Sequence, residues 1–136
     1  MSDVIRPLPQ PTDLTRPYWQ AAARGELHMQ HCQACNRWQF YPRPFCVHCE
    51  SDDVQWRAVS GLGRIYTYTV NYRAPNPFMK QRLPYVVALV ELDEGPRLMA
   101  NIQGDGALET SIGRRVKVIF EAISEELALP QFTLME

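Results

Sequence analysis

The residues with the clearest chemical potential are four cysteines, Cys32, Cys35, Cys46 and Cys49. They form two Cys-x-x-Cys pairs separated by ten residues, which leaves room for a hairpin that brings the second pair back to the first. Four thiolates arranged in this way can surround one zinc ion at about 2.3 Å. Because four protein ligands leave no coordination position for water or substrate, the pattern predicts a structural Zn2+ site rather than a catalytic one.

Other uses of these cysteines fit the chain less well. Two disulfides would need an oxidising compartment, and the polar, proline-containing N-terminus does not resemble a secretory signal. An iron site would use the same four thiolates, so the sequence alone does not separate zinc from iron. A redox pair would need one Cys-x-x-Cys that opens a helix. His28, His31 and His48 are expected to be strand or hydrogen-bonding residues, because four cysteines already complete the site.

No second constellation of catalytic type is evident. The sequence contains no Gly-x-Ser-x-Gly elbow, phosphate-binding loop or dinucleotide fingerprint. Glu91, Asp93 and Glu94 cluster at the end of a predicted strand, where a solvated hairpin tip is expected. Glu125 and Glu126 have the character of a charged surface loop. The sequence therefore predicts a chain without independent catalytic activity.

Composition and charge argue against several functional classes, including membrane proteins and nucleic-acid-binding proteins. The chain has 136 residues, 46% of them hydrophobic and 21% charged, which is typical of a globular protein. Its net charge of −1 lacks the basic excess that usually accompanies nucleic-acid binding. No run approaches the roughly 18 apolar residues that a transmembrane helix needs. These features favour a cytoplasmic protein that binds neither membranes nor nucleic acid.

The N-terminal half must position the cysteines. Residues 1–11 form a proline-rich arm, and Pro17 followed by an alanine-containing stretch predicts a short helix over 18–24 that ends at Gly25. Strands are predicted over 27–31, 38–41 and 54–59, and they enclose the two cysteine pairs. Asn36 follows Cys35 at a position that favours a left-handed backbone conformation.

The C-terminal half has β character throughout. Predicted strands cover residues 65–72, 85–92, 97–102, 116–121 and 132–134, with a buried, mostly apolar strand at 85–92. No long helix intervenes, and closure into a small barrel would remove the exposed strand edges. An OB-fold is therefore the first choice and a small β-sandwich the alternative. The predicted divisions are 1–26 for the arm and helix, 27–58 for the zinc ribbon and 59–136 for the OB-fold domain.

Two segments are candidates for binding. The loop over 73–84 is stiffened by three prolines and carries Arg73, Phe78 and Arg82. Aromatic and arginine residues are enriched in protein interfaces, and arginine also suits a phosphorylated cofactor such as CoA. A short helix is marginal on its own, so Tyr18 and Trp19 must pack against the ribbon, the barrel or a partner. A plain surface loop is the simpler alternative for residues 73–84. In an OB-fold, aromatic side chains could also stack on single-stranded nucleic acid, although packing in the barrel core explains many of them equally well; these are Tyr66, Tyr68, Tyr72, Phe78 and Tyr85.

The order of these features resembles the zinc-ribbon/OB-fold family known as a domain of unknown function associated with thiolases and acyl-CoA metabolism. The similarity runs from about residue 12 to the C-terminus. One departure is Asn36, where such ribbons often have glycine. The residues that carry the resemblance are Pro17-Tyr18-Trp19, Gly25-Glu26-Leu27, Cys32-Gln33-Ala34-Cys35, Pro42-Arg43, Cys46-Val47-His48-Cys49, Ser60-Gly61-Leu62-Gly63, 66–70, Arg73-Ala74-Pro75, 84–88 and 91–95.

The resemblance implies a mainly β chain with an N-terminal helix, a rubredoxin-like zinc ribbon and a C-terminal OB-fold barrel. It also implies a non-catalytic accessory subunit of a thiolase-fold enzyme that makes or breaks carbon–carbon bonds in acyl-CoA thioesters. Such a subunit would support assembly and substrate access. The alternative hypothesis is a stand-alone OB-fold module that binds acyl-CoA or single-stranded nucleic acid.

Overall fold

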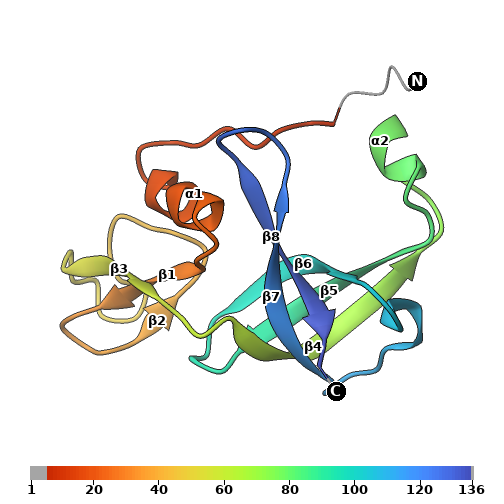
Figure 1. Ribbon diagram of the computed structural model, residues 1–136. Helices are drawn as coiled ribbons and strands as arrows, with labels where there is room; N and C mark the ends of the chain where they lie inside the picture. The colour runs from red at the N-terminus through yellow and green to blue at the C-terminus, as the bar shows by residue number, and fades with distance from the viewer. Residues whose placement is uncertain (1–5, 136) are drawn as a thin grey trace.

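The computed structural model describes residues 6–135 and has two parts, with one helix packed against both (Figure 1). A three-stranded sheet forms the first part, and a closed five-stranded barrel forms the second. Helix α1, Arg16–Ala23, lies beside the small sheet and faces the barrel. The predicted mainly β architecture with an OB-type barrel is confirmed, and the closure of the barrel excludes the β-sandwich alternative.

Helix α1 has start and stop signals close to those predicted. Thr15 precedes the helix, and the Thr12 and Thr15 hydroxyls each accept a hydrogen bond from the other residue's backbone N–H, at 3.2 and 2.9 Å. Pro17 occupies the first turn, where its missing N–H has no cost. Gly25 ends the helix with φ of +81°, a conformation that favours glycine. The helix buries Tyr18, Ala21 and Ala22.

The small sheet is built around β1, His28–Cys32, which pairs with β2, Trp38–Gln39, and with β3, Val54–Ala58, both antiparallel. The prediction of a strand as far as Tyr41 was too long. The buried amides of Gln30 and Gln39 bond to one another at 2.7 Å and also bind the backbone of the following turn, including the Arg43 N–H at 2.8 Å. These side chains replace the backbone ladder and redirect the chain toward the second cysteine pair.

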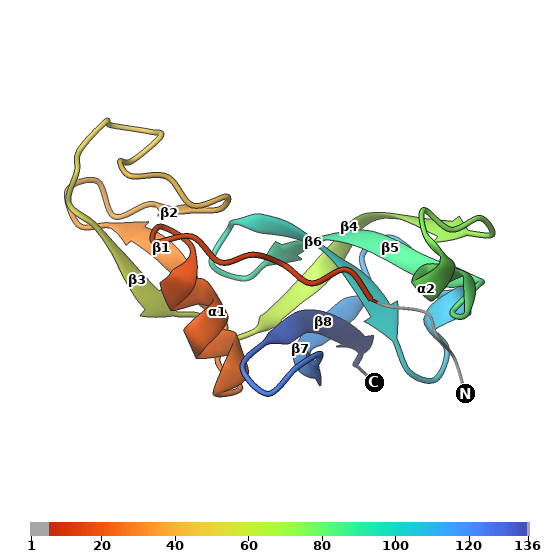
Figure 2. The same cartoon turned by 90° about the horizontal axis from the view of Figure 1, so that it is seen from above.

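The barrel comprises β4, Leu62–Asn71; β5, Tyr85–Leu92; β6, Arg97–Gln103; β7, Arg115–Ala122; and β8, Ala128–Leu134. Its order is β4-β5-β6-β8-β7, and all neighbours are antiparallel except β6 and β8 (Figure 2). Strand β5 matches the predicted bounds, but only alternate residues are buried, since one face is turned outward. Strand β8 is longer than expected. It accommodates the buried Pro130, which pairs with Phe120 of β7 where β6 does not reach.

One apolar core connects the two parts. Its barrel members include Ile65, Val86 and Phe132. It continues into the small sheet through Leu27, just before β1, and Met29, within β1. Tyr18 of α1 joins the same cluster. The ribbon is therefore packed against the barrel rather than tethered by a linker, and a change in one part is felt in the other.

The loop between β4 and β5 contains a feature that the sequence analysis missed. Helix α2, Pro77–Lys80, forms a single turn, with the Asn76 side chain accepting a hydrogen bond from the Met79 N–H at 2.9 Å. Asn76-Pro77 supplies a good cap followed by proline at the first helical position. Within residues 6–135, no helix has the length and hydrophobicity that a membrane span requires.

Candidate metal centre and apolar groove

The structure brings the four predicted ligands together. All four cysteine sulfurs lie within 4.8 Å of one another, with Cys32 Sγ 3.6 Å from Cys49 Sγ and Cys35 Sγ 3.7 Å from Cys46 Sγ. A regular tetrahedron with metal–sulfur bonds of about 2.3 Å has sulfur–sulfur edges of about 3.8 Å. The donor set and its spacing therefore fit a single tetrahedral metal ion.

The backbone turns after the two cysteine pairs have the same geometry. The Asn36 N–H donates to the Cys32 carbonyl and the Glu50 N–H to the Cys46 carbonyl, both at 2.9 Å. Asn36 and Glu50 have φ of +62° and +65°, so the residue after each pair is left-handed. The prediction for Asn36 is confirmed. Glu50 was missed because nothing in its side chain favours this conformation, although its position after Cys49 is equivalent.

Backbone N–H groups donate to two of the cysteine sulfurs and so favour their thiolate form. The Cys35 N–H lies 3.5 Å from Cys32 Sγ, and the His48 N–H lies 3.3 Å from Cys46 Sγ. Burial raises the pKa of the Cys46 thiol, but the Cys49 and His48 amides and the neighbouring thiols outweigh it and lower the pKa to about 6. Burial raises the pKa of Cys35. Without a cation the thiols do not all ionise together, so metal binding is coupled to proton release.

The three histidines have partners other than the cysteine cluster. His31 is buried edge-on against Trp38, with ring centroids 4.7 Å apart, and its Nδ1 lies 3.0 Å from Gln33 Nε2. His48 Nδ1 lies 3.3 Å from the Arg37 guanidinium, and His28 Nε2 lies 2.9 Å from Glu26. These contacts match the expected hydrogen-bonding roles and leave the ligand set to the cysteines.

The predicted hairpin turn joins β5 to β6, and the carboxylates beside it also form ion pairs with arginines. Glu91 accepts from Arg64 at 2.8 Å and Arg97 at 3.2 Å, and Asp93 accepts from Arg115 at 2.7 Å. These guanidinium groups lower the pKa of both acids. Both therefore remain anionic near neutrality and do not form an acid–base pair.

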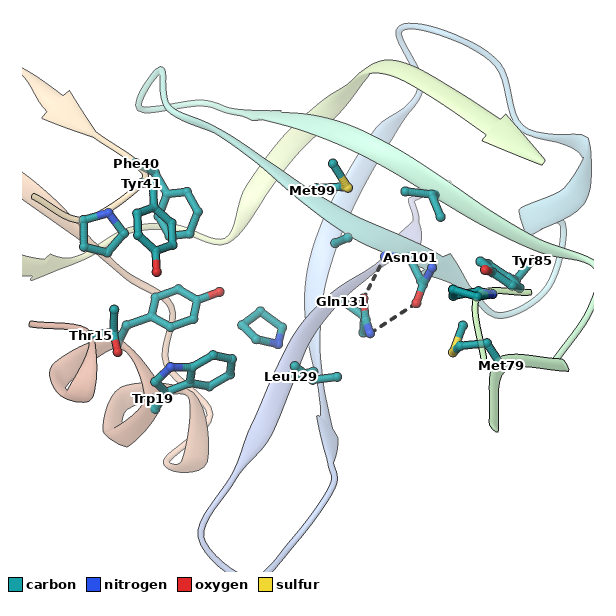
Figure 3. Close-up of a pocket in the computed structure, with 16 residues that line it drawn as sticks. Thr15, Trp19, Phe40, Tyr41, Met79, Tyr85, Met99, Asn101, Leu129 and Gln131 are labelled. Atoms are coloured by element: carbon teal, nitrogen blue, oxygen red, sulfur yellow. Dashed lines mark hydrogen bonds between the residues drawn. The ribbon is translucent and has the colours of Figure 1, made fainter. Parts of the chain in front are cut away.

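A groove of about 430 Å³ lies between α1, the segment after β2 and the β5-β6-β8 face of the barrel (Figure 3). Tyr18 and Trp19 line it, as do Tyr41 and Met99, which are 56% and 73% exposed. The walls are predominantly apolar and aromatic. Burial raises the pKa of Tyr18, so its hydroxyl stays neutral. Such a concave apolar surface with large exposed side chains on its rim is suited to binding.

Two amides supply the polar part of this groove. The Asn101 N–H donates to Gln131 Oε1 at 2.7 Å, and the Gln131 amide lies 3.4 Å from Asn101 Oδ1 (Figure 3). Gln131 Nε2 also lies 3.4 Å from Glu121 Oε1, on the next strand. The amides are therefore held in fixed orientations by neighbouring side chains.

The three candidate binding residues of the 73–84 loop do not form one site. Phe78 and Arg82 lie together, with the Arg82 guanidinium 5.0 Å from the Phe78 ring, and Arg82 also forms an ion pair with Glu121. Arg73 is exposed and lines a separate hollow with Lys80. Sequence reasoning missed Glu121 and its second partner, Arg6 of the N-terminal arm, because their contact spans 115 positions and follows no local pattern.

Acid should weaken the fold through Glu121. Burial raises its pKa, but hydrogen bonds from Arg82 and Arg6 outweigh this and lower the pKa to about 2. Because this value lies below the unfolded value of about 4.3, the contribution is complete above pH 5 and is lost as pH falls toward 2. Glu121→Gln should remove this dependence and cost about 1–2 kcal/mol at neutral pH, after allowance for solvent screening.

Urea denaturation midpoints measured between about pH 2 and 6 would test this expectation. Glu126→Gln, in the exposed β7–β8 turn, is the matched control and should leave the pH profile unchanged. An identical acid profile for the parent chain and the Glu121→Gln variant would contradict the assigned role of Glu121.

Comparison with known proteins assigns both parts of the chain. Residues 19–55 match the family model of the ChsH2 rubredoxin-like zinc ribbon domain, and residues 56–121 match that of the ChsH2 C-terminal OB-fold domain. A solved structure titled "Ltp2-ChsH2(DUF35) aldolase" has a TM-score of 0.83 and 35% identity and covers 93% of this chain and 98% of that one. A DUF35 structure from Sulfolobus solfataricus shares the fold, with a TM-score of 0.64 at 16% identity.

Two curated relatives are about as similar to this chain in sequence as that first solved structure is. A "DUF35 domain-containing scaffold protein" of Methanothermobacter thermautotrophicus is 32% identical over 85% of this chain and 86% of its own length. A "Probable enoyl-CoA hydratase alpha subunit" of Thermomonospora curvata is 37% identical over 94% of this chain, but this chain spans only 40% of that relative. The matched region is thus a whole protein in some relatives and one part of a longer protein in others.

Proposed function

Because this chain belongs to the ChsH2-type DUF35 family of zinc-ribbon/OB-fold proteins, we propose that it is a non-catalytic accessory subunit of an enzyme acting on acyl-CoA thioesters. We propose a thiolase-fold partner, with this chain supporting assembly and substrate access. The observation that carries the proposal is the coverage of 98% of a chain from the structure named "Ltp2-ChsH2(DUF35) aldolase". The scaffold and hydratase-subunit names of the relatives support the same role.

The chemistry of the chain supports a subunit without its own reaction. Across residues 6–135 the cysteines form one closed cluster, and the histidines and the Glu91–Asp93 carboxylates have other partners. We propose that the cluster holds structural Zn2+, since its four thiolates would leave no position for substrate. The ion would fix the ribbon in the shape that presents its outer surface and the groove.

The groove is the proposed contact region. Tyr18 and Trp19 form its α1 side, and the exposed Tyr41 and Met99 offer apolar contacts at its rim. Large aromatic and methionine side chains are enriched at the centres of protein interfaces. Arg73, exposed beside Lys80, is proposed to meet CoA phosphates at the edge of the same interface, because guanidinium groups bind phosphate through two parallel hydrogen bonds. A cytoplasmic location accords with acyl-CoA chemistry.

Co-expression with a thiolase-fold protein from the same genome would test the proposal. We expect a stable complex in size-exclusion chromatography with light scattering, and acyl-CoA turnover that requires both chains. Met99→Glu should weaken assembly at least about tenfold by placing a charge at the rim. Ile112→Glu, at a 67% exposed position that does not line the groove, is the matched control. A chain that remains alone beside a fully active thiolase-fold protein would overturn the proposal.

A further inference from the structure

The N-terminal arm, residues 6–14, ends in a clamp that the proposed function does not require. Arg6 donates two hydrogen bonds to Glu121, from Nη1 to Oε2 and from Nη2 to Oε1, both at 3.2 Å. Its guanidinium also lies 4.7 Å from the centre of the Phe78 ring. Arg82 lies 5.0 Å from the same ring and pairs with the same carboxylate. Two arginines therefore share one aromatic ring and one acid.

The clamp formed by Arg6, Glu121 and Phe78 is partly buried and is supported by further hydrogen-bond donors. The side chains of Arg6 and Glu121 are only 16% and 18% exposed, so the pair is shielded from much of the solvent. The amides of Gln103 and Gln131 lie 3.3 and 3.4 Å from Glu121 Oε1 and add further donors. Charge-assisted bidentate bonds of this type are stronger than ordinary surface ion pairs, which are usually worth little.

The arm connects two opposite walls of the groove. At one end it leads into α1, whose Tyr18 and Trp19 line the groove. At the other end Arg6 holds Phe78 of α2, and the neighbouring Pro75 and Met79 line the opposite wall. Figures 1 and 2 both show the arm running from α1 across to α2.

The intervening residues suit a strap. Pro7, Pro9 and Pro11 alternate along the arm, and prolines keep a chain extended, so little entropy is lost when its end is fixed. Pro7, Leu8, Gln10 and Pro11 are exposed, with Leu8 at 48%. Pro9 is half-buried, and within residues 6–11 Arg6 supplies the ion pair that fastens the arm to the barrel.

We propose that the arm is a releasable strap, fastened by Arg6 to Glu121 and Phe78, that holds the α2 wall of the groove in place. Arg82 keeps its own bond to Glu121 when Arg6 detaches, but Phe78 then loses one of its two guanidinium contacts. The loop over 73–84 gains freedom, and Pro75 and Met79 move away from the α1 side. Strap release thus widens the groove without unfolding the barrel. The proposal concerns the isolated chain and does not depend on any partner.

Hydrogen–deuterium exchange of the full chain would test the strap. Arg6→Gln should raise exchange in peptides covering 73–84 at least about fivefold, while β5 and β7 remain as in the parent chain. Hydroxyl-radical modification of Met79 should rise about twofold relative to Met99, which is already exposed and serves as an internal reference. Arg16→Gln is the matched control, because Arg16 is exposed and pairs with the exposed Asp13, away from Glu121 and Phe78.

A second variant distinguishes the clamp from general destabilisation. Phe78→Leu keeps an apolar side chain but removes the ring on which both arginines lie, and it should also raise exchange in the 73–84 loop. Unchanged exchange of this loop in Arg6→Gln would overturn the proposal. So would a uniform rise across all strands, since that would indicate loss of global stability instead of a local release.

Discussion

Cys32→Ser should abolish stoichiometric metal binding and unfold the ribbon. Cys32 is 1% exposed and ends β1, so its loss removes a ligand and disturbs the central strand of the small sheet. Structural zinc contributes roughly 10–16 kcal/mol to the folding of small zinc modules, which exceeds the stability of most domains. The segment around the two cysteine pairs has little apolar core of its own to compensate.

The effect should extend beyond the metal. Leu27 and Met29 belong to the same buried cluster as the barrel residues, so an unfolded ribbon exposes one side of that cluster. We expect a large fall in the thermal midpoint, lower solubility and weaker partner binding. Mass spectrometry would measure the zinc content, and calorimetry would measure the thermal midpoint.

His48→Ala is the matched control for the cysteine substitution. His48 is exposed beside the ligands, and its contribution to Cys46 comes from the backbone N–H, which alanine retains. Zinc content and the thermal midpoint should therefore stay close to those of the parent chain. A Cys32→Ser variant with full zinc content, or lost complex activity with zinc and assembly intact, would contradict the structural role of the site.

Phe132→Ala should destabilise the barrel by about 3–5 kcal/mol, because a fully buried aromatic ring would be replaced by a cavity. Phe132 has no exposed surface and pairs with Val118 of β7 and Ile102 of β6. A loss of this size is a large part of the stability of a small domain. Urea denaturation at neutral pH would measure it.

Met99→Ala provides the comparison for the core substitution. Met99 is 73% exposed, and its truncation should change the free energy of unfolding by less than about 0.5 kcal/mol. Similar losses for Phe132→Ala and Met99→Ala would show that Phe132 does not stabilise the barrel in the way its burial indicates.

The parts of the fold that follow local patterns were predictable from sequence. The cysteine spacing identified the metal cluster, the turn signals at Pro17 and Gly25 placed α1, and the hydrophobic run at 85–92 gave β5. Each rests on residues close together in the chain, whose chemistry is restrictive enough to leave few alternatives.

The remaining features depend on contacts between distant residues. The Gln30–Gln39 amide pair ends β2 early, and neither glutamine is unusual in a strand. The Arg6–Glu121 pair joins the two ends of the sequence. Tyr18 and Trp19 were expected to pack on something, but the groove they line with Met99 exists only once the ribbon meets the barrel. Local propensity carries no information about such long-range pairings.

The parallel contact between β6 and β8 is one of the places where the barrel can open. It joins Ile102 to Phe132 and Gln103 to Thr133, whereas the antiparallel contacts of β5 with β4 and β6 extend along most of their lengths. The contact between β4 and β7 is also short and is confined to residues 62–64 and 115–117. The barrel therefore has two short seams, and separation along either leaves every hairpin intact. Phe132 lies at the β6–β8 seam with its ring in the core. Opening this seam would expose the whole aromatic side chain to water, which is unfavourable. Opening at the β6–β8 seam would change the groove directly, because residues of both strands line it.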